Sequence, residues 1–311
     1  MPHDPNDPHD RPELHGVPTY EGRPLPRPDE EVVDQGLAFD VGTLLSRRQA
    51  LRAFGFGVTA LGLAACSGGT GGATSSTSSS TSSATGTGAA GEIPDETAGP
   101  YPGDGSNGPD VLEQSGVVRG DITSSFGDAS GTAQGVPMQL ELVLSDLAKD
   151  GAPFTGAAVY VWHCDREGRY SLYSDGATDQ NYLRGVQVAD ADGKVRFTSI
   201  FPACYAGRWP HIHFEVYPNQ SAITDAGKAI ATSQVALPKD ACDAVYATQG
   251  YETSVRSLSQ LSLASDNVFG DDGGASQLGA VSGDAARGYT VSLAVGVDTT
   301  TTPTGGGGPP R

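Results

Sequence analysis

Apolar and polar side chains alternate with a period of two in several segments of the chain. The alternation is clearest at residues 138–144, 159–162, 195–197 and 289–297, where Met, Leu, Val, Phe or Tyr occupies every second position. Such a pattern is typical of β-strands, because successive side chains of a strand point to opposite faces of its sheet. The segments between them contain clusters of Gly, Asp and Pro, which favour turns. The pattern predicts an all-β domain built as an antiparallel β-sandwich with long loops.

Residues 238–246 are the one segment in which we expect a helix, because Pro238 suits a first-turn position. Residues 182–185 are expected to open a hairpin whose second strand leads toward residue 199. The sequence contains no glycine-rich nucleotide fingerprint, no GxSxG elbow and no internal repeat. We therefore expect a single domain at residues 93–297, an Ig/prealbumin-like β-sandwich with one short helix.

The chain on either side of this domain has a different composition. Residues 1–45 are rich in Pro, Asp, Glu and Arg and show almost no apolar periodicity, so a disordered extension is expected. Residues 67–92 are dominated by Ser, Thr and Gly, which favours a flexible linker. Residues 298–311 are rich in Thr, Gly and Pro and are expected to form a flexible tail.

Residues 46–66 carry an export pattern. Adjacent arginines at 47–48 precede a weakly apolar run that ends at Cys66. This order is typical of a Tat-type signal, and the run is too short to span a bilayer permanently. Residues 63–66 (LAAC) resemble a lipobox, so Cys66 is expected to carry a lipid and to anchor the protein on the outer side of the cell membrane. The alternative is an ordinary signal cut nearby, which would release a secreted protein.

The net charge limits the possible binding partners, and the cysteines raise the question of a disulfide. The net charge is −18, from 19 basic and 37 acidic residues, which argues against nucleic acid as a partner. Three cysteines follow the signal, at 164, 204 and 242. In an oxidising compartment two of them can form a disulfide; Cys204–Cys242 is slightly favoured, and the other pairings stay open.

Two histidines share one face of the strand expected around residues 211–217. His211 and His213 lie about 7 Å apart along a strand and point the same way, while Ile212 and Phe214 face the other layer. Tyr205 and Arg208 lie just upstream in a turn. We interpret the pair of imidazoles as metal ligands. The alternative is that they cap a sheet edge.

The scarcity of histidine limits the rest of the ligand set. Of six histidines, three lie before residue 46, and the others are His163, His211 and His213. His163 is expected to be packed inside a strand rather than to bind metal, so further ligands must be oxygen or sulfur donors. Tyrosinate favours a hard trivalent ion and imidazole tolerates iron. Tyr170, which follows a Gly-Arg turn, is a second tyrosine that can point inward.

Several motifs together resemble the intradiol ring-cleavage dioxygenases, the family that includes protocatechuate 3,4-dioxygenase and catechol 1,2-dioxygenase. The resemblance covers about residues 93–240. The matching segments are 97–101 (TAGPY), 119–122 (RGDI), 161–165 (VWHCD), 168–171 (GRYS), 184–185 (RG), 197–202 (FTSIFP), 205–213 (YAGRWPHIH) and 233–234 (SQ).

The resemblance implies a ferric ion, Fe(3+), as cofactor, and a catechol and O2 as partners. The implied metal ligands are Tyr170, Tyr205, His211 and His213. The implied catalytic residues are Arg208 and Gln234, which polarise the substrate, and Tyr205, which is released when the substrate binds. The reaction would cleave the ring between its two hydroxyl-bearing carbons and give a cis,cis-muconate-type diacid. Tyr101 is expected in the substrate pocket, while the identity of the catechol and the oligomeric state stay open.

Two other readings are compatible with the sequence. Glu215 shares the strand face of His211 and His213, so a ferrous site of two histidines and one carboxylate is possible. A lipid-anchored β-sandwich could also be a non-catalytic module for carbohydrates or aromatic compounds. In that case Tyr101, Trp209 and Tyr217 would be exposed stacking platforms.

Overall fold

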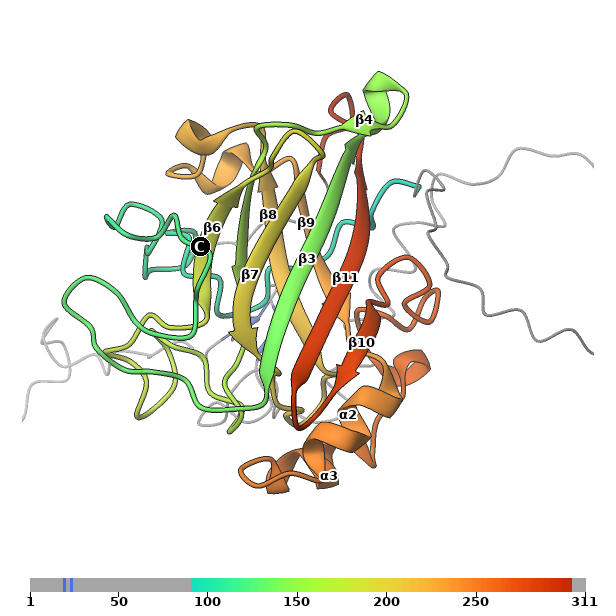
Figure 1. The fold of residues 1–311 in the computed structure, drawn as a ribbon. Coiled ribbons are helices and arrows are strands. Elements are labelled where there is room, and N and C mark those ends of the chain that lie inside the picture. Colours follow the sequence, from blue (N-terminus) through green and yellow to red (C-terminus); the bar gives the residue numbers. More distant parts are fainter. Residues whose placement is uncertain (1–18, 21–22, 25–90, 304–311) are drawn as a thin grey trace, which may run out of the picture.

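The computed structural model describes residues 19–20, 23–24 and 91–303 (Figure 1). The predicted export signal, the lipidation site Cys66 and most of the linker lie outside the described residues. Within the N-terminal extension, the described residues are the two-residue strands β1 (Thr19–Tyr20) and β2 (Arg23–Pro24), which pair antiparallel. No helix among the described residues is long and apolar enough to cross a membrane.

Two β-sheets make up the body of the domain, as the alternation of apolar residues predicted. The first sheet has the order β10-β11-β3-β4, with β7 on the β4 side of β3. Its strands are β3 (Pro137–Asp146), β4 (Ala152–Pro153), β7 (Lys194–Ile200), β10 (Ala280–Asp284) and β11 (Gly288–Val297). The second sheet, β6-β5-β8-β9, consists of β5 (Ala158–Trp162), β6 (Arg184–Val188), β8 (His211–Tyr217) and β9 (Ala231–Ala236).

One pair of strands departs from the antiparallel arrangement that we expected. β3 and β11 run parallel, with Met138 opposite Tyr289 at one end and Asp146 opposite Val297 at the other. Alternation of side chains is the same in parallel and antiparallel strands, so the sequence pattern does not distinguish them. The prediction of a purely antiparallel sandwich was wrong at this pair.

The predicted hairpin after residue 182 was also wrong. β6 and β7 are joined by a tight turn in which Gly193 donates its N–H to the carbonyl of Asp190. However, β6 pairs with β5 in one sheet, and β7 pairs with β3 in the other. The turn therefore carries the chain from one layer of the sandwich to the other.

The predicted helix is present, and a second one was missed. α2 (Lys239–Tyr246) begins after Pro238, and α3 (Glu252–Leu258) follows a short loop. Figure 1 shows both at the end of the sheets near β10. Within residues 91–303, four single-turn 3-10 helices lie in the loops: η2 (Leu147–Lys149), η3 (Gln220–Ala222), η4 (Ala226–Lys228) and η5 (Leu263–Ser265). The seven-residue α3 buries only Ser254 and Leu258, so its apolar periodicity is too short to be recognised.

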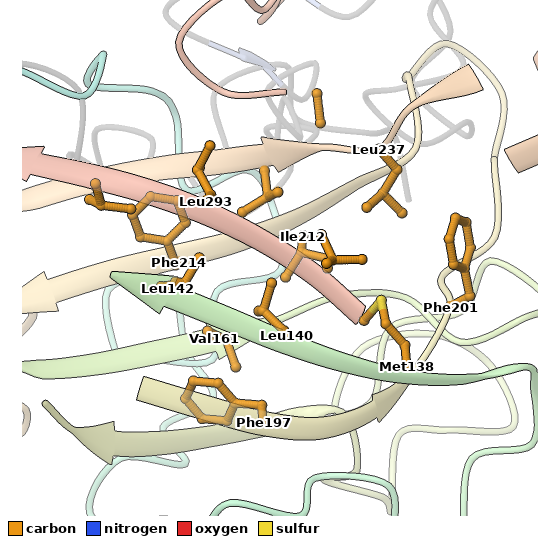
Figure 2. Close-up of a cluster of buried hydrophobic side chains, with 14 of the residues drawn as sticks. Met138, Leu140, Leu142, Val161, Phe197, Phe201, Ile212, Phe214, Leu237 and Leu293 are labelled. Carbon is orange, nitrogen blue, oxygen red and sulfur yellow. The ribbon is translucent and has the colours of Figure 1, made fainter. Parts of the chain in front are cut away.

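The main core fills the space between the two sheets (Figure 2). Met138, Leu140 and Leu142 of β3 meet Ile212 and Phe214 of β8 there, as their alternation predicted. Phe214 is fully buried, and burial of such a side chain stabilises the fold by about 2–3 kcal/mol. Because Ile212 and Phe214 face this core, His211 and His213 must point to the outer face of the second sheet.

The three cysteines of the domain are free thiols, so the predicted Cys204–Cys242 disulfide was wrong. Each thiol is buried and faces backbone carbonyl oxygens: Cys164 Sγ faces that of Ala203, Cys204 Sγ that of Arg208 and Cys242 Sγ that of Leu237. The pairing failed as a prediction because cysteine spacing does not report the direction of the side chains.

Candidate metal centre

His211 and His213 lie on the face of β8 that points away from the main core. Their Nε2 atoms approach to 3.0 Å, although neither ring is exposed by more than 3%. The Nδ1 atom of His211 lies 2.5 Å from the carbonyl oxygen of Trp209. A carbonyl oxygen only accepts, so Nδ1 carries the proton and the lone pair of Nε2 is free to bind a metal.

His213 is held by stacking. The indole of Trp162, its cross-strand neighbour on β5, lies parallel to the imidazole with an interplanar angle of 5° and a centroid separation of 4.9 Å. On another side, Gly99 has a positive φ of 71°, and a Cβ there would lie 3.2 Å from His213 Cε1. Glycine therefore both allows the turn and leaves room for the imidazole.

Two tyrosines from loops complete a cluster of four donor atoms. Tyr170 lies in the long loop between β5 and β6, and Tyr205 in the turn between β7 and β8. Their hydroxyl oxygens are 3.3 Å apart. The oxygen of Tyr170 is 3.4 Å from His211 Nε2, and that of Tyr205 is 3.2 Å from the same nitrogen. The structure thus brings together all four residues predicted as metal ligands.

Burial controls the protonation of this cluster in the absence of a cation. Desolvation, with the nearby charge of Arg208, lowers the pKa of His211 to about 3, and desolvation with the charge on His211 lowers that of His213 well below its usual value. Desolvation raises the pKa of Tyr170 and Tyr205 far above that of a free phenol, against the opposing effect of Arg208. The imidazoles are therefore neutral, and a hard cation is needed to remove the phenol protons.

The donor set fits a hard metal ion. For bonds of about 2.0–2.1 Å, neighbouring ligand atoms of a tetrahedral or higher coordination shell lie about 2.8–3.4 Å apart. The separations of 3.0–3.4 Å between the donor atoms fall within this range. Two phenolates and two imidazoles suit ferric iron, because tyrosinate is a hard anionic donor. With Fe³⁺ the site would carry one net positive charge.

Arg208 lies beside the four donors in a buried position. Its Nη2 donates to Gln234 Oε1 at 2.7 Å, and Gln234 Nε2 donates to the carbonyl oxygen of Thr97 at 3.0 Å. Its Nε donates to Asp266 at 3.1 Å. The family resemblance implied Arg208 and Gln234 as neighbours of the substrate, but nothing in the sequence pointed to Asp266, which lies in an irregular segment more than fifty residues beyond Arg208.

Arg184 connects two of the loops around the site, a role that its place in the RG motif did not reveal. Its guanidinium donates to the carbonyl oxygens of Tyr101 and Pro102 and to the carbonyl and hydroxyl oxygens of Ser171. These bonds join the neighbour of Tyr170 to the turn that carries Tyr101. The ring of Tyr101, predicted in the substrate pocket, contacts that of Tyr170 at a centroid distance of 4.9 Å.

His163 is packed away from the donors, as predicted. Its Nδ1 lies 2.8 Å from the carbonyl oxygen of Cys164, and its Nε2 lies 2.7 Å from the hydroxyl of Ser199. Both ring nitrogens of His163 therefore have hydrogen-bonding partners within the protein.

Parts of the chain are similar in sequence to known dioxygenases. Residues 107–224 match the family model described as Dioxygenase. A chlorocatechol 1,2-dioxygenase from Rhodococcus opacus is 46% identical over 55 residues, 18% of this chain and 21% of the relative. A catechol 1,2-dioxygenase from Pseudomonas sp. (strain EST1001) is 40% identical over 55 residues, 18% of each protein. The aligned segments thus span about a fifth of these curated relatives.

A solved structure extends the similarity to the whole described domain. The intradiol ring-cleavage dioxygenase from Tetranychus urticae superposes with a TM-score of 0.54 over 68% of this chain and 97% of that chain, at 22% identity. The chain has the fold of the intradiol ring-cleavage dioxygenases. Its homologues are named as catechol and chlorocatechol 1,2-dioxygenases, which are intradiol ring-cleaving oxidoreductases.

The positions of Glu215, Trp209 and Tyr217 disfavour the two other readings of the sequence. Among the described residues, no group of three or more His, Cys, Asp or Glu side chains is placed to hold a metal, and Glu215 instead accepts a hydrogen bond from Tyr217. Trp209 is 3% exposed and Tyr217 is fully buried, so neither can be a surface stacking platform. The predictions that treated these residues as exposed binding surfaces were wrong.

Proposed function

We propose that this protein is a non-haem Fe(III) dioxygenase that cleaves catechol-type rings between the two hydroxyl-bearing carbons, with O2 as co-substrate. The observation that carries the proposal is the convergence of Tyr170, Tyr205, His211 and His213, whose four donor atoms form a chain of contacts between 3.0 and 3.4 Å. The product would be a cis,cis-muconate-type diacid. The family similarity supports this choice of chemistry.

The bound ferric ion would supply a Lewis acid that binds a catechol as its dianion and makes the ring reactive toward O2. The two tyrosines differ in their access to such a substrate. Tyr170 is 2% exposed and enclosed by its loop, whereas Tyr205 is partly exposed and precedes the exposed residues Ala206 and Gly207. Tyr205 can therefore move aside with little disruption, and its phenolate oxygen can take a proton from a catechol hydroxyl.

Arg208 supplies the positive charge that the reaction needs on the substrate side. Its Nε and Nη2 are occupied by Asp266 and Gln234, while Nη1 makes no hydrogen bond to the described residues. A guanidinium held in this way stabilises negative charge that develops on the substrate oxygens, at no cost of reorganisation. Gln234 supports this position through its second bond, to Thr97.

Visible absorption and oxygen uptake test the proposal. Iron-loaded protein should be burgundy-red from tyrosinate-to-Fe³⁺ charge transfer, and it should consume O2 with at least one of catechol, protocatechuate and hydroxyquinol. The product should be the diacid opened between the hydroxyl-bearing carbons. A colourless iron-loaded protein, or a ring opened beside the diol, would contradict the assigned ligands. Tyr246→Phe, which removes a buried hydroxyl bonded to Pro202, is a matched control and should keep colour and activity.

We further propose that the enzyme works outside the cell on a lipid anchor. The arginine pair at 47–48 and the cysteine at 66 support this proposal from the sequence. Expression in a bacterium with a Tat system should give a membrane-associated protein whose mature N-terminal residue is Cys66. Cys66→Ala should shift the protein to the soluble fraction, and replacement of both arginines by lysine should keep it inside the cell. Recovery of an intact peptide from residues 1–30 in the exported protein would refute processing at Cys66.

A further inference from the structure

Arg208 is held from two sides by groups that come from different parts of the chain. Its side chain is almost fully buried, between Gln234 on β9 and Asp266 in the segment after η5. Asp266 follows the matched family segment, 107–224, by more than forty residues. It therefore adds to the site a residue that neither the motif comparison nor the strand pattern indicated.

Asp266 is itself rigidly positioned. Oδ1 accepts hydrogen bonds from the backbone N–H groups of Val268 and Phe269, at 2.9 and 3.1 Å. Oδ2 accepts from the backbone N–H of Trp209 at 2.6 Å and from Arg208 Nε at 3.1 Å. All four contacts are made by a carboxylate with no exposed side-chain surface. The carboxylate is thus a fixed anchor and not a flexible counter-ion.

The electrostatics of the pair agree with this geometry. Burial alone would raise the pKa of Asp266, but Arg208 and the backbone N–H donors hold that pKa below its usual value. Burial would likewise lower the pKa of Arg208, yet the charge of Asp266 raises it. Removing one partner of such a pair leaves an uncompensated buried charge. Both groups therefore stay ionised in the folded protein.

We propose that Asp266 is a positioning residue that holds the Arg208 guanidinium in the orientation that presents Nη1 to the catechol oxygens. The inference rests on the proposed function. With Nε fixed by Asp266 and Nη2 fixed by Gln234, the planar guanidinium has one orientation left. Without Asp266, the guanidinium can rotate about its remaining contact with Gln234, and Nη1 loses its fixed direction.

The variant that tests this proposal is Asp266→Asn, which keeps the shape of the side chain and removes its charge. Loss of a charged hydrogen bond changes an equilibrium by about tenfold to a hundredfold. We expect kcat/KM to fall, and the dissociation constant for catechol measured without O2 to rise, each within this range. Iron content should not change and the charge-transfer band should stay close to that of the wild type, because the hydrogen bonds of Asp266 go to Arg208, Trp209, Val268 and Phe269 and to none of the four ligand side chains.

Asp146→Asn is the matched control. Asp146 is also a buried carboxylate that accepts a backbone N–H, from Ala148, and pairs with a basic residue, Lys149. It ends β3, about 30 Å along that strand from Pro137, which pairs with Ile200 at the end of β7 where the segment that carries Tyr205 begins. Both variants should lower thermal stability, because each removes a buried charge that accepts hydrogen bonds, but Asp146→Asn should keep kcat/KM and catechol affinity.

A double-mutant cycle separates action through Arg208 from action through the metal ligands. If Asp266 works through Arg208, Asp266→Asn should add little to the loss caused by Arg208→Ala. Additive losses, or a loss of iron or colour in Asp266→Asn, would overturn the proposal and indicate action through Trp209 and His211.

The contact between Asp266 and Arg208 can also be observed by NMR without any enzyme activity. In the metal-free full chain, the Nε–H resonance of Arg208 should be protected from exchange, and it should be lost in both Asp266→Asn and Arg208→Ala. A wild-type protein that shows this resonance but oxidises no catechol would contradict the proposed function and not the pairing. An active enzyme in which Asp266→Asn changes neither catechol affinity nor kcat/KM would overturn the role of Asp266.

Discussion

The buried imidazole of His163 allows a prediction about the stability of the fold that does not depend on catalysis. We consider His163→Phe, which keeps an aromatic ring and removes both ring nitrogens. The carbonyl oxygen of Cys164 and the hydroxyl of Ser199 lose their partners in this variant. Each buried group left without a partner costs about 1–3 kcal/mol, so the loss of both partners should make the variant less stable by about 2–6 kcal/mol near neutral pH.

The size of this loss should depend on pH. Burial lowers the pKa of His163 from 6.5 to about 4. Between these two values the unfolded chain binds a proton that the folded chain does not, so acid destabilises the wild-type protein through this residue. Integration gives a loss of about 2 kcal/mol on going from about pH 7 to about pH 5, and about 3 kcal/mol at about pH 4. His163→Phe lacks this loss, so the gap between the two proteins should shrink by the same amounts.

Urea unfolding of the iron-free proteins across this pH range is the appropriate assay, since His211 and His213 are present in both proteins and most of their contribution cancels in the difference. Tyr251→Phe is the matched control. It removes a buried hydroxyl that bonds to Phe201 and Val136, and its penalty should not vary with pH. A constant gap between wild type and His163→Phe would refute the reasoning. So would a large loss of bound iron in His163→Phe, because the ring does not face the donor cluster.

Three further substitutions probe the site and the core. Tyr205→Phe removes one of the two phenolate ligands, so it should weaken and shift the visible absorption, to which Tyr170 still contributes, and abolish most turnover; an unchanged spectrum would show that Tyr205 is not a ligand. Arg208→Ala should keep iron and colour but lower kcat/KM by at least about tenfold, as measured by oxygen uptake, because the charge that stabilises the substrate oxygens is lost; equal turnover would remove its assigned role. Phe214→Ala should lower the unfolding free energy by about 3–5 kcal/mol, because it opens a cavity between the sheets; a loss below about 1 kcal/mol in chemical denaturation would contradict its place in the core.

Some positions in the site follow from the geometry of a single strand, and others depend on which strands pair. His211 and His213 could be assigned to one face from their spacing alone, because the geometry of a strand places residues two apart on the same side. Gln234 is opposite His213 in the β8–β9 register, and this neighbour could not be inferred from spacing, because pairing between strands is not encoded by alternation. The same limit explains the parallel pairing of β3 with β11.

The sequence by itself determined the strands, their buried faces, the helix after Pro238 and the residue types able to bind a hard metal ion. These properties depend on residues a few positions apart in the sequence, so the local pattern of side chains is enough to predict them. Only the tertiary structure decided that Tyr170 and Tyr205, from two separate loops, meet the histidines of β8, and that the three cysteines stay apart as thiols. Only the fold, likewise, placed Asp266 against Arg208. Contacts of this kind arise from the packing of whole sheets and loops, and the direction of each side chain within that packing is set by residues far away in the sequence.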